Sequence, residues 1–211
     1  MFKKLREQQF RFSKDGEDVL TLSYKGARNW DVLYKGDVIG SFKFNRKELK
    51  RGREFKLPDG SDLLLRYVKR GSLLFWEASL NGKTAYNTLV SQHRYIWGSW
   101  LAVAFIFPLS LIVQYADVPG ADEVVIPIII IEVPLILAVA FLVKIRWKPV
   151  AWIMAVLWVV GLGAEWLSFI SDPQGIPPIL ETIGVLIFRD FLVNAKFVWR
   201  VLDQLTSYMQ A

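Results

Sequence analysis

The sequence predicts an α+β protein in which a small all-β N-terminal domain, a sandwich or open barrel, precedes a transmembrane α-helical bundle. Short runs of alternating apolar and polar residues fill residues 8–88, and long apolar stretches follow them. The charges divide in the same way, since residues 1–94 hold 20 basic and 11 acidic residues and residues 95–211 hold 6 and 9. We therefore expect two domains, residues 1–90 and residues 91–211.

The N-terminal part carries the period-two pattern of β-strands. Leu20, Leu22 and Tyr24 alternate with polar residues, and DLLLRYV (62–68) repeats the pattern. The segments YKGD, LPDGS and LNGK are typical of tight turns, because glycine supplies the positive φ that hairpins need. We expect five to seven strands around a single core.

A basic segment, NRKELKRGREFK (45–56), lies between two expected strands. We interpret it either as a patch that faces anionic lipid headgroups or a partner protein, or as a solvated loop that only keeps the domain inside and soluble. Phe44 and Phe55 are the nearby aromatic residues, which disfavours nucleic acid, because base recognition needs more stacking surfaces. The candidate lipid- or partner-facing residues are Arg46, Lys47, Lys50, Arg51, Arg53 and Lys56.

Three apolar stretches approach the roughly 20 residues that cross a hydrocarbon core about 30 Å thick. They are residues 95–115, 124–143 and 150–170. A fourth stretch, residues 176–201, is interrupted by charged residues. It either crosses the membrane or leads from a short re-entrant piece into a helix on the membrane surface. We favour the crossing, because Lys196 and Arg200 then end it on the inner side.

The connections between these stretches alternate in charge. The connection 144–149 holds three basic residues, whereas 115–123 and 171–178 hold acidic residues alone. Because Lys and Arg are retained on the cytoplasmic side, four crossings make a multi-pass protein of the cell membrane with both termini in the cytoplasm. The absence of a signal peptide pattern at the N-terminus agrees with this orientation. An inner aromatic belt would contain Trp97, Trp100, Trp147, Trp152 and Trp199.

Four ionisable residues fall within the apolar stretches. With a rise of ~1.5 Å per residue, Glu132 lies ~12 Å and Arg189 ~18 Å below the outer edge, while Glu165 and Glu181 lie at ~8 Å and ~6 Å. A carboxylate that faces lipid costs about 2.5–3.5 kcal/mol on insertion scales. We therefore expect Glu132 to pair with Arg189, which fixes the fourth segment against the second. The alternative is a proton or ion path along these four residues.

Small residues occur together in the third apolar stretch. Gly161, Gly163 and Ala164 lie in VGLGAEW (160–166). Small side chains let the backbones of membrane helices approach closely. We expect these residues to form a helix-packing surface, either within the bundle or in an oligomer.

The sequence carries no signature of catalysis or of a bound cofactor. It contains no cysteine, which excludes disulfides, thiolate metal sites and cysteine nucleophiles. His93 is the sole histidine, and no Ser/His/Asp arrangement is apparent around it. No glycine-rich phosphate loop precedes a helix, and no cluster has metal-ligand spacing. We expect no enzyme activity, no cofactor and no metal.

The segment EFKLPDGSDLLLRYVKRGSLLFWEASLNGK (54–83), followed by apolar stretches, resembles a set of small uncharacterised bacterial membrane proteins. Those proteins carry an N-terminal β-domain with an LPDGS turn, an aliphatic strand and an NG turn, and continue into about four membrane segments. The match covers residues 30–83 in the order of its elements and the membrane part in layout alone. The resemblance implies an architecture but no activity.

We expect a membrane accessory or scaffold protein whose cytoplasmic β-domain binds a partner protein or the membrane face. One alternative is a small channel or transporter subunit that uses the intramembrane carboxylates. Another is a ligand-sensing membrane effector whose β-domain triggers the bundle. The expected partners are the lipid bilayer, a protein or a second copy of the chain, and anionic lipid headgroups.

Overall fold

The structure is a computed structural model that describes residues 7–13, 18–70, 73–116, 119–120, 122–171, 182–183, 191 and 194–210. The chain divides into two compact units. The first, here called the β-unit, comprises Met1–Lys69, Leu73–Gln92 and Gln204–Ala211. The second, the helical unit, comprises Arg70–Ser72 and His93–Asp203. The last residues, expected in the membrane domain, therefore group with the β-unit.

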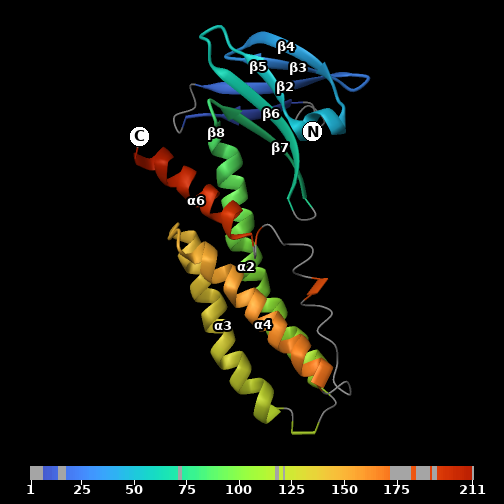
Figure 1. Cartoon of the computed structure of the whole chain (residues 1–211), viewed down its shortest axis with the longest axis vertical. Coiled ribbons are helices and arrows are strands. Elements are labelled where there is room, and N and C mark those ends of the chain that lie inside the picture. The colour runs from blue at the N-terminus through green and yellow to red at the C-terminus, as the bar shows by residue number, and fades with distance from the viewer. Residues whose placement is uncertain are drawn as a thin grey trace. The chain divides into compact units, whose positions relative to one another are not determined.

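The described residues of the β-unit form eight strands in two four-stranded antiparallel sheets (Figure 1). The first sheet has the order β1 (Glu7–Arg11), β2 (Val19–Gly26), β3 (Asn29–Tyr34) and β4 (Asp37–Lys43). The second has the order β5 (Arg53–Lys56), β6 (Asp62–Arg70), β7 (Leu73–Leu80) and β8 (Lys83–Thr84). The expected all-β domain is confirmed as a pair of sheets, and it has more strands than the five to seven expected.

Alternation along the strands directs one face of each sheet into a common core. Leu20 and Leu22 of β2 are fully buried, as are Leu63 and Leu65 of β6. These residues belong to one apolar cluster with members from both sheets, so the sheets pack face to face. Full burial of one such leucine contributes about 1.5–3 kcal/mol to stability. The core therefore depends on the register that keeps these residues inside.

Aromatic rings extend this core. Trp76 of β7 lies at their centre, with its ring centroid 5.0 Å from that of Tyr67 and 5.7 Å from those of Trp30 and Phe44. These separations fall within the roughly 4.5–7 Å that aromatic pairs favour. Gly40 of β4 makes room for another ring, because a Cβ there would lie 3.0 Å from the ring of Phe55. The two sheets are thus joined by ring packing as well as by aliphatic side chains.

The basic segment forms a short helix, α1 (Arg46–Arg51), and then strand β5, so the interpretation as a solvated loop was wrong. Asn45 caps the helix, since its Oδ1 accepts a hydrogen bond from the Lys47 N–H at 3.1 Å. Buried Leu49 anchors the helix in the core. Gly52 ends it at a φ of 102°, where an added Cβ would lie 2.7 Å from Cδ1 of Leu64.

Four longer helices follow: α2 (Tyr86–Tyr115), α3 (Asp122–Lys144), α4 (Val150–Ser171) and α6 (Ala195–Gln210). Helices α3 and α4 lie side by side (Figure 1). Two of the described helices are long and apolar enough to cross a membrane, over Tyr86–Val113 and Val125–Lys144, and Val150–Gly163 is a shorter apolar stretch. An all-β part followed by such helices confirms the α+β class.

The fourth predicted stretch is not one continuous helix over 176–201. Asn194 is not helical and caps α6, because its Oδ1 accepts a hydrogen bond from the Phe197 N–H at 3.1 Å. Helix α6 therefore begins at Ala195 and continues beyond 201. It is amphipathic, with Val201 and Leu202 buried and Asp203 exposed. Most of residues 176–193 lies outside the described part of the chain.

Candidate functional site

A basic cleft of about 700 Å³ lies in the β-unit. Strand pairing and a turn bring its walls together. Asn29 pairs with Lys43 across β3 and β4, and the Phe44 N–H donates a hydrogen bond to the Arg28 carbonyl at 2.7 Å. The α1 helix and the start of β5 complete the cleft. Its lining residues are Arg28, Lys43, Phe44, Asn45, Arg46, Glu48 and Arg53.

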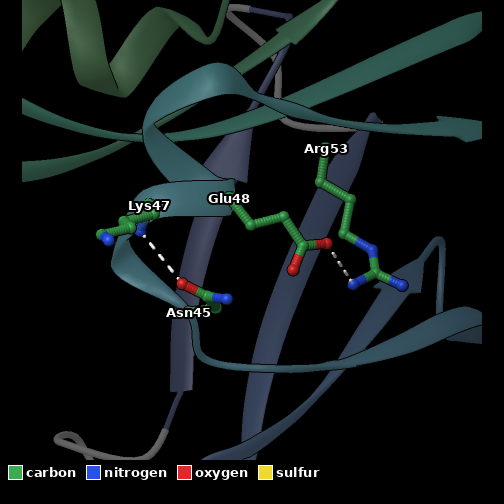
Figure 2. A network of polar contacts seen from close by, with 4 residues as sticks. All are labelled: Asn45, Lys47, Glu48 and Arg53. Carbon is green, nitrogen blue, oxygen red and sulfur yellow. Dashed lines mark hydrogen bonds and ion pairs between the residues drawn. The ribbon is translucent and has the colours of Figure 1, made fainter.

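Basic residues outnumber acidic ones in this cleft, and one of the basic residues is already paired. Glu48 is paired with Arg53, whose Nη1 lies 3.0 Å from Oε1 of Glu48 (Figure 2). The Arg53 guanidinium also lies 5.7 Å from the centroids of two aromatic rings, those of Phe42 and Phe55. Arg53 therefore holds the cleft together. The remaining three cations are exposed, and no described residue forms an ion pair with them; they are Arg28, Lys43 and Arg46.

The structure places some of the predicted basic residues in the cleft and the others outside it. Arg46 and Arg53 line the cleft, whereas the other four are exposed outside it on α1 and β5; these are Lys47, Lys50, Arg51 and Lys56. Sequence reasoning missed Arg28 and Lys43, because their proximity arises from strand pairing. The register of the alternating segment 19–43 is the signal that could have found them.

A second concave site, an apolar cavity of about 400 Å³, lies among α2, α3 and α4 in the helical unit. Trp100, Val103 and Phe107 line it from α2. Ile131, Glu132, Leu135 and Ile136 line it from α3, and residues between 156 and 162 line it from α4. Positions three, four and seven residues apart lie on one side of a helix. The lining residues of α2 and α3 therefore each form one helix face.

Glu132 is the one charged side chain among the described residues that line this cavity. No hydrogen bond or ion pair joins its carboxylate to another described residue. Its predicted partner Arg189 lies outside the described residues, as does Glu181. Glu165 lies in α4, but its side chain is outside the described set. The pair of Glu132 with Arg189 therefore stays a prediction.

Two tryptophans form part of the cavity wall. The ring centroids of Trp100 and Trp158 lie 6.2 Å apart at an interplanar angle of 61°. Both indole N–H groups are buried and have no acceptor among the described residues. Trp100, expected in the inner aromatic belt, is instead only 2% exposed. Trp147 and Trp152 are exposed, as a belt requires.

Among the described residues, open space lies beside Gly161 and Gly163. A Cβ added at either position would meet no atom within 4 Å. Gly161 instead lines the apolar cavity, whereas Gly163 does not. The side chain of Ala164 is outside the described set. A contact of these residues with a second copy of the chain stays a prediction.

His93 has a structural partner. Its Nε2–H donates a hydrogen bond to the carbonyl of Val143 at 2.9 Å, which joins α2 to the end of α3. At this end of α3, Nζ of Lys144 lies 5.9 Å from the centroid of the Trp97 ring. Within the described ranges, no group of three His, Cys, Asp or Glu residues could hold a metal ion. The two concave sites are therefore the candidates for function.

Comparisons with protein-family models, with curated proteins and with solved structures give no match to this chain. The resemblance to small bacterial membrane proteins therefore stays a prediction. Function has to be argued from the chemistry of the two sites.

Proposed function

We propose that the chain is a multi-pass membrane accessory or scaffold protein whose cytoplasmic β-unit docks to an anionic surface through the basic cleft. Two apolar helices support a bilayer as the surroundings of the helical unit. The observation that carries the proposal is the cleft itself. Three exposed cations meet there, while its single carboxylate is already paired with Arg53.

The charge of the connections supports this orientation. The last residue of α3 and the connection to α4 carry Lys144, Arg146 and Lys148. The connection between α2 and α3 carries one charged residue, Asp117, and α3 begins with Asp122 and Glu123. Because basic connections stay in the cytoplasm, the end of α3 and the start of α4 lie on that side. His93 hydrogen-bonds to the end of α3. Helix α2 therefore enters the membrane from the cytoplasm.

Two contacts join described residues of the segment between α4 and α6 to the other helices. Near the outer end of α4, Nε1–H of Trp166 donates a hydrogen bond to Oγ1 of Thr182 at 2.9 Å. Near the inner end of α2, the ring of Phe191 stacks on Tyr95 with 5.8 Å between their centroids. Thr182 therefore lies beside α4, and Phe191 lies beside α2. A fourth passage between α4 and α6 would return the chain to the cytoplasm.

The phosphate-bearing headgroups of the bilayer are the anions that this cleft fits best. Arginine and lysine both bind phosphate, and arginine does so with two parallel hydrogen bonds. A basic residue near an anionic leaflet contributes about 1 kcal/mol, so three such residues contribute about 3 kcal/mol. Lys47 and Lys50 on α1 are also exposed and add positive charge to the β-unit outside the cleft. A partner protein with an acidic face is the other outcome that the experiment distinguishes.

The experiment uses the full chain in nanodiscs of phosphatidylcholine. It measures their capture by separate vesicles of phosphatidylcholine with or without phosphatidylserine. We expect capture by the anionic vesicles alone, and weaker capture as salt is added, because salt screens exposed charges. The double variant Arg28→Glu/Lys43→Glu should lower the apparent affinity on the order of thirtyfold, since two contributions of about 1 kcal/mol are lost.

The matched control is the double variant Lys69→Glu/Lys83→Glu. It changes the net charge equally, on exposed residues of β6 and β8 that do not line the cleft. This control should be captured almost as well as the unaltered chain. An equal loss in both variants would reject the cleft as the docking site. Failure of anionic vesicles to capture the chain, together with cleft-dependent binding of an acidic protein, would assign the cleft to a protein partner.

A further inference from the structure

We propose that the apolar cavity among α2, α3 and α4 binds a small amphipathic cation whose charge is met by Glu132 and by the rings of Trp100 and Trp158. The site lies in the helical unit and shares no residue with the basic cleft. The inference therefore does not rest on the proposed docking of the β-unit.

The single carboxylate indicates that the ligand carries a positive charge. Glu132 lies within Val125–Lys144, a stretch apolar enough to cross a membrane. A carboxylate in hydrocarbon needs a cation, a proton or water. The described residues of the cavity wall include no cation, and the Glu132 side chain is exposed rather than covered by protein. A cation that enters the cavity can therefore reach the carboxylate.

The aromatic rings select the kind of cation. Tryptophan attracts cations more strongly than other aromatic side chains do. Trp100 and Trp158 are inclined at 61° to each other, so differently oriented ring surfaces line one space. Apolar walls cannot replace the oxygen ligands of a hydrated metal ion. A substituted ammonium ion carries its charge on an apolar surface and fits both features.

The volume and the remaining wall limit the ligand further. About 400 Å³ falls within the roughly 300–1,000 Å³ that small-molecule sites occupy. Much of the remaining wall is aliphatic, as at Val103 and Leu135. The cavity has open space beside Gly161, where an added Cβ would meet no atom within 4 Å. The ligand class is therefore a monovalent ammonium ion with an apolar body.

The experiment measures equilibrium binding of radiolabelled phenyltrimethylammonium to the full chain in phosphatidylcholine nanodiscs, with protein-free nanodiscs subtracted. tert-Butylbenzene serves as an uncharged molecule of the same shape. Glu132→Gln should lower affinity for the cation on the order of thirtyfold, as loss of one partner of a close charge pair does. Binding of tert-butylbenzene should stay the same. Glu123→Gln, at the exposed start of α3, should leave both ligands unaffected.

A second pair of variants tests the location. Gly161→Leu fills the cavity and should abolish binding of both probes. Gly163→Leu adds the same side chain at an equally open position outside the cavity, and should retain binding. Helical circular dichroism and melting temperature check the fold of each variant. Equal cation binding by the unaltered chain and Glu132→Gln, or no cation binding by the unaltered chain, would overturn the proposal.

Discussion

The two units direct their large apolar side chains in opposite directions. In the β-unit, Phe10 and Leu22 lie in the core with at most 1% exposure. In the helical unit, Phe105 is 74% exposed and Val159 is 69% exposed. Water surrounds a fold of the first kind, whereas broad apolar surfaces mark contact with a membrane or another protein. The helical unit therefore presents a broad apolar surface, which a membrane or another protein would cover.

The charged residues also differ between the two units. In the β-unit, Lys35 pairs with Asp18 at the surface, where an ion pair is ordinary. In the helical unit, Lys148 pairs with Asp203 outside the apolar stretches of α3 and α4. Glu132 lies inside such a stretch and lines a cavity. A carboxylate therefore has a cation partner at the surface of the β-unit, whereas the Glu132 carboxylate has none among the described residues.

The largest expected effect comes from truncating a phenylalanine in each unit. Phe10→Ala should lower the free energy of unfolding by about 3–5 kcal/mol, because it leaves a cavity in the sandwich core. Phe105→Ala removes the same atoms from an exposed position and should change stability very little. Denaturant unfolding of the full chain in nanodiscs measures both. Equal losses would break the contrast between the units.

The next effect comes from adding a charge to two valines of similar exposure. Val159 in α4 is 69% exposed and Val38 in β4 is 62% exposed. Val159→Lys should oppose membrane insertion by about 2.5–3.5 kcal/mol, because it brings an ammonium group into hydrocarbon. Val38→Lys should stay within about 0.5 kcal/mol of the original stability. Resistance of the chain to carbonate extraction measures insertion, and equal tolerance of both lysines would contradict the membrane environment.

Substitutions of glycine by alanine should have a smaller effect on stability, which depends on how tightly each glycine is packed. Gly52→Ala should destabilise the β-unit by about 2–3 kcal/mol, because it adds both a strained φ and overpacking against Leu64. Gly60→Ala, which has a positive φ but no neighbour within 4 Å, should cost about 1 kcal/mol. Gly161→Ala in α4 should be neutral or stabilising. Melting temperatures in nanodiscs should follow this order, and an equal response at Gly52 and Gly60 would remove the packing argument.

The smallest effect concerns acid stability of the β-unit. A hydrogen bond from Lys35 lowers the pKa of the Asp18 carboxyl, against the opposing effect of burial, and the Tyr34 hydroxyl donates to the same carboxylate. Because the folded pKa lies below the unfolded one, this stabilisation is present above the unfolded pKa and is lost as pH falls through the folded pKa. Lys35→Met should therefore reduce the loss of stability on acidification. Unfolding measured at neutral and acidic pH tests this, and Lys83→Met, which should leave the dependence unchanged, is the control.

The long helices could be predicted from the sequence because apolar length is a local property. The expected stretches 124–143 and 150–170 became Asp122–Lys144 and Val150–Ser171. Helix α2 begins at Tyr86, whereas the predicted stretch began at residue 95. The prediction began too late because Gln92 and His93 interrupt the apolar pattern, although both are buried. Helix α1 carried a signal that the charges obscured: Asn45 precedes Glu48 by three residues, as in a helix cap, and Gly52 follows.

The two sites could be predicted only in part. Glu132 was found because a carboxylate in an apolar stretch is conspicuous in the sequence. The meeting of Trp100 with Trp158 depends on the packing of α2 against α4, and the meeting of Arg28 with Lys43 depends on strand register. Such long-range packing is not encoded in any local pattern. The single residue was therefore predictable, whereas the cavity around it was not.

The orientation that we propose places the β-unit and α6 in the cytoplasm and the connection between α2 and α3 outside. The sequence contains no cysteine, so single cysteines can be labelled without background. They are introduced at exposed positions by Ala116→Cys after α2, Lys83→Cys in β8 and Ser207→Cys in α6. A membrane-impermeant maleimide should label Ala116→Cys in intact cells, and the other two only after the membrane is opened. Labelling of Lys83→Cys or Ser207→Cys from outside intact cells would contradict the account.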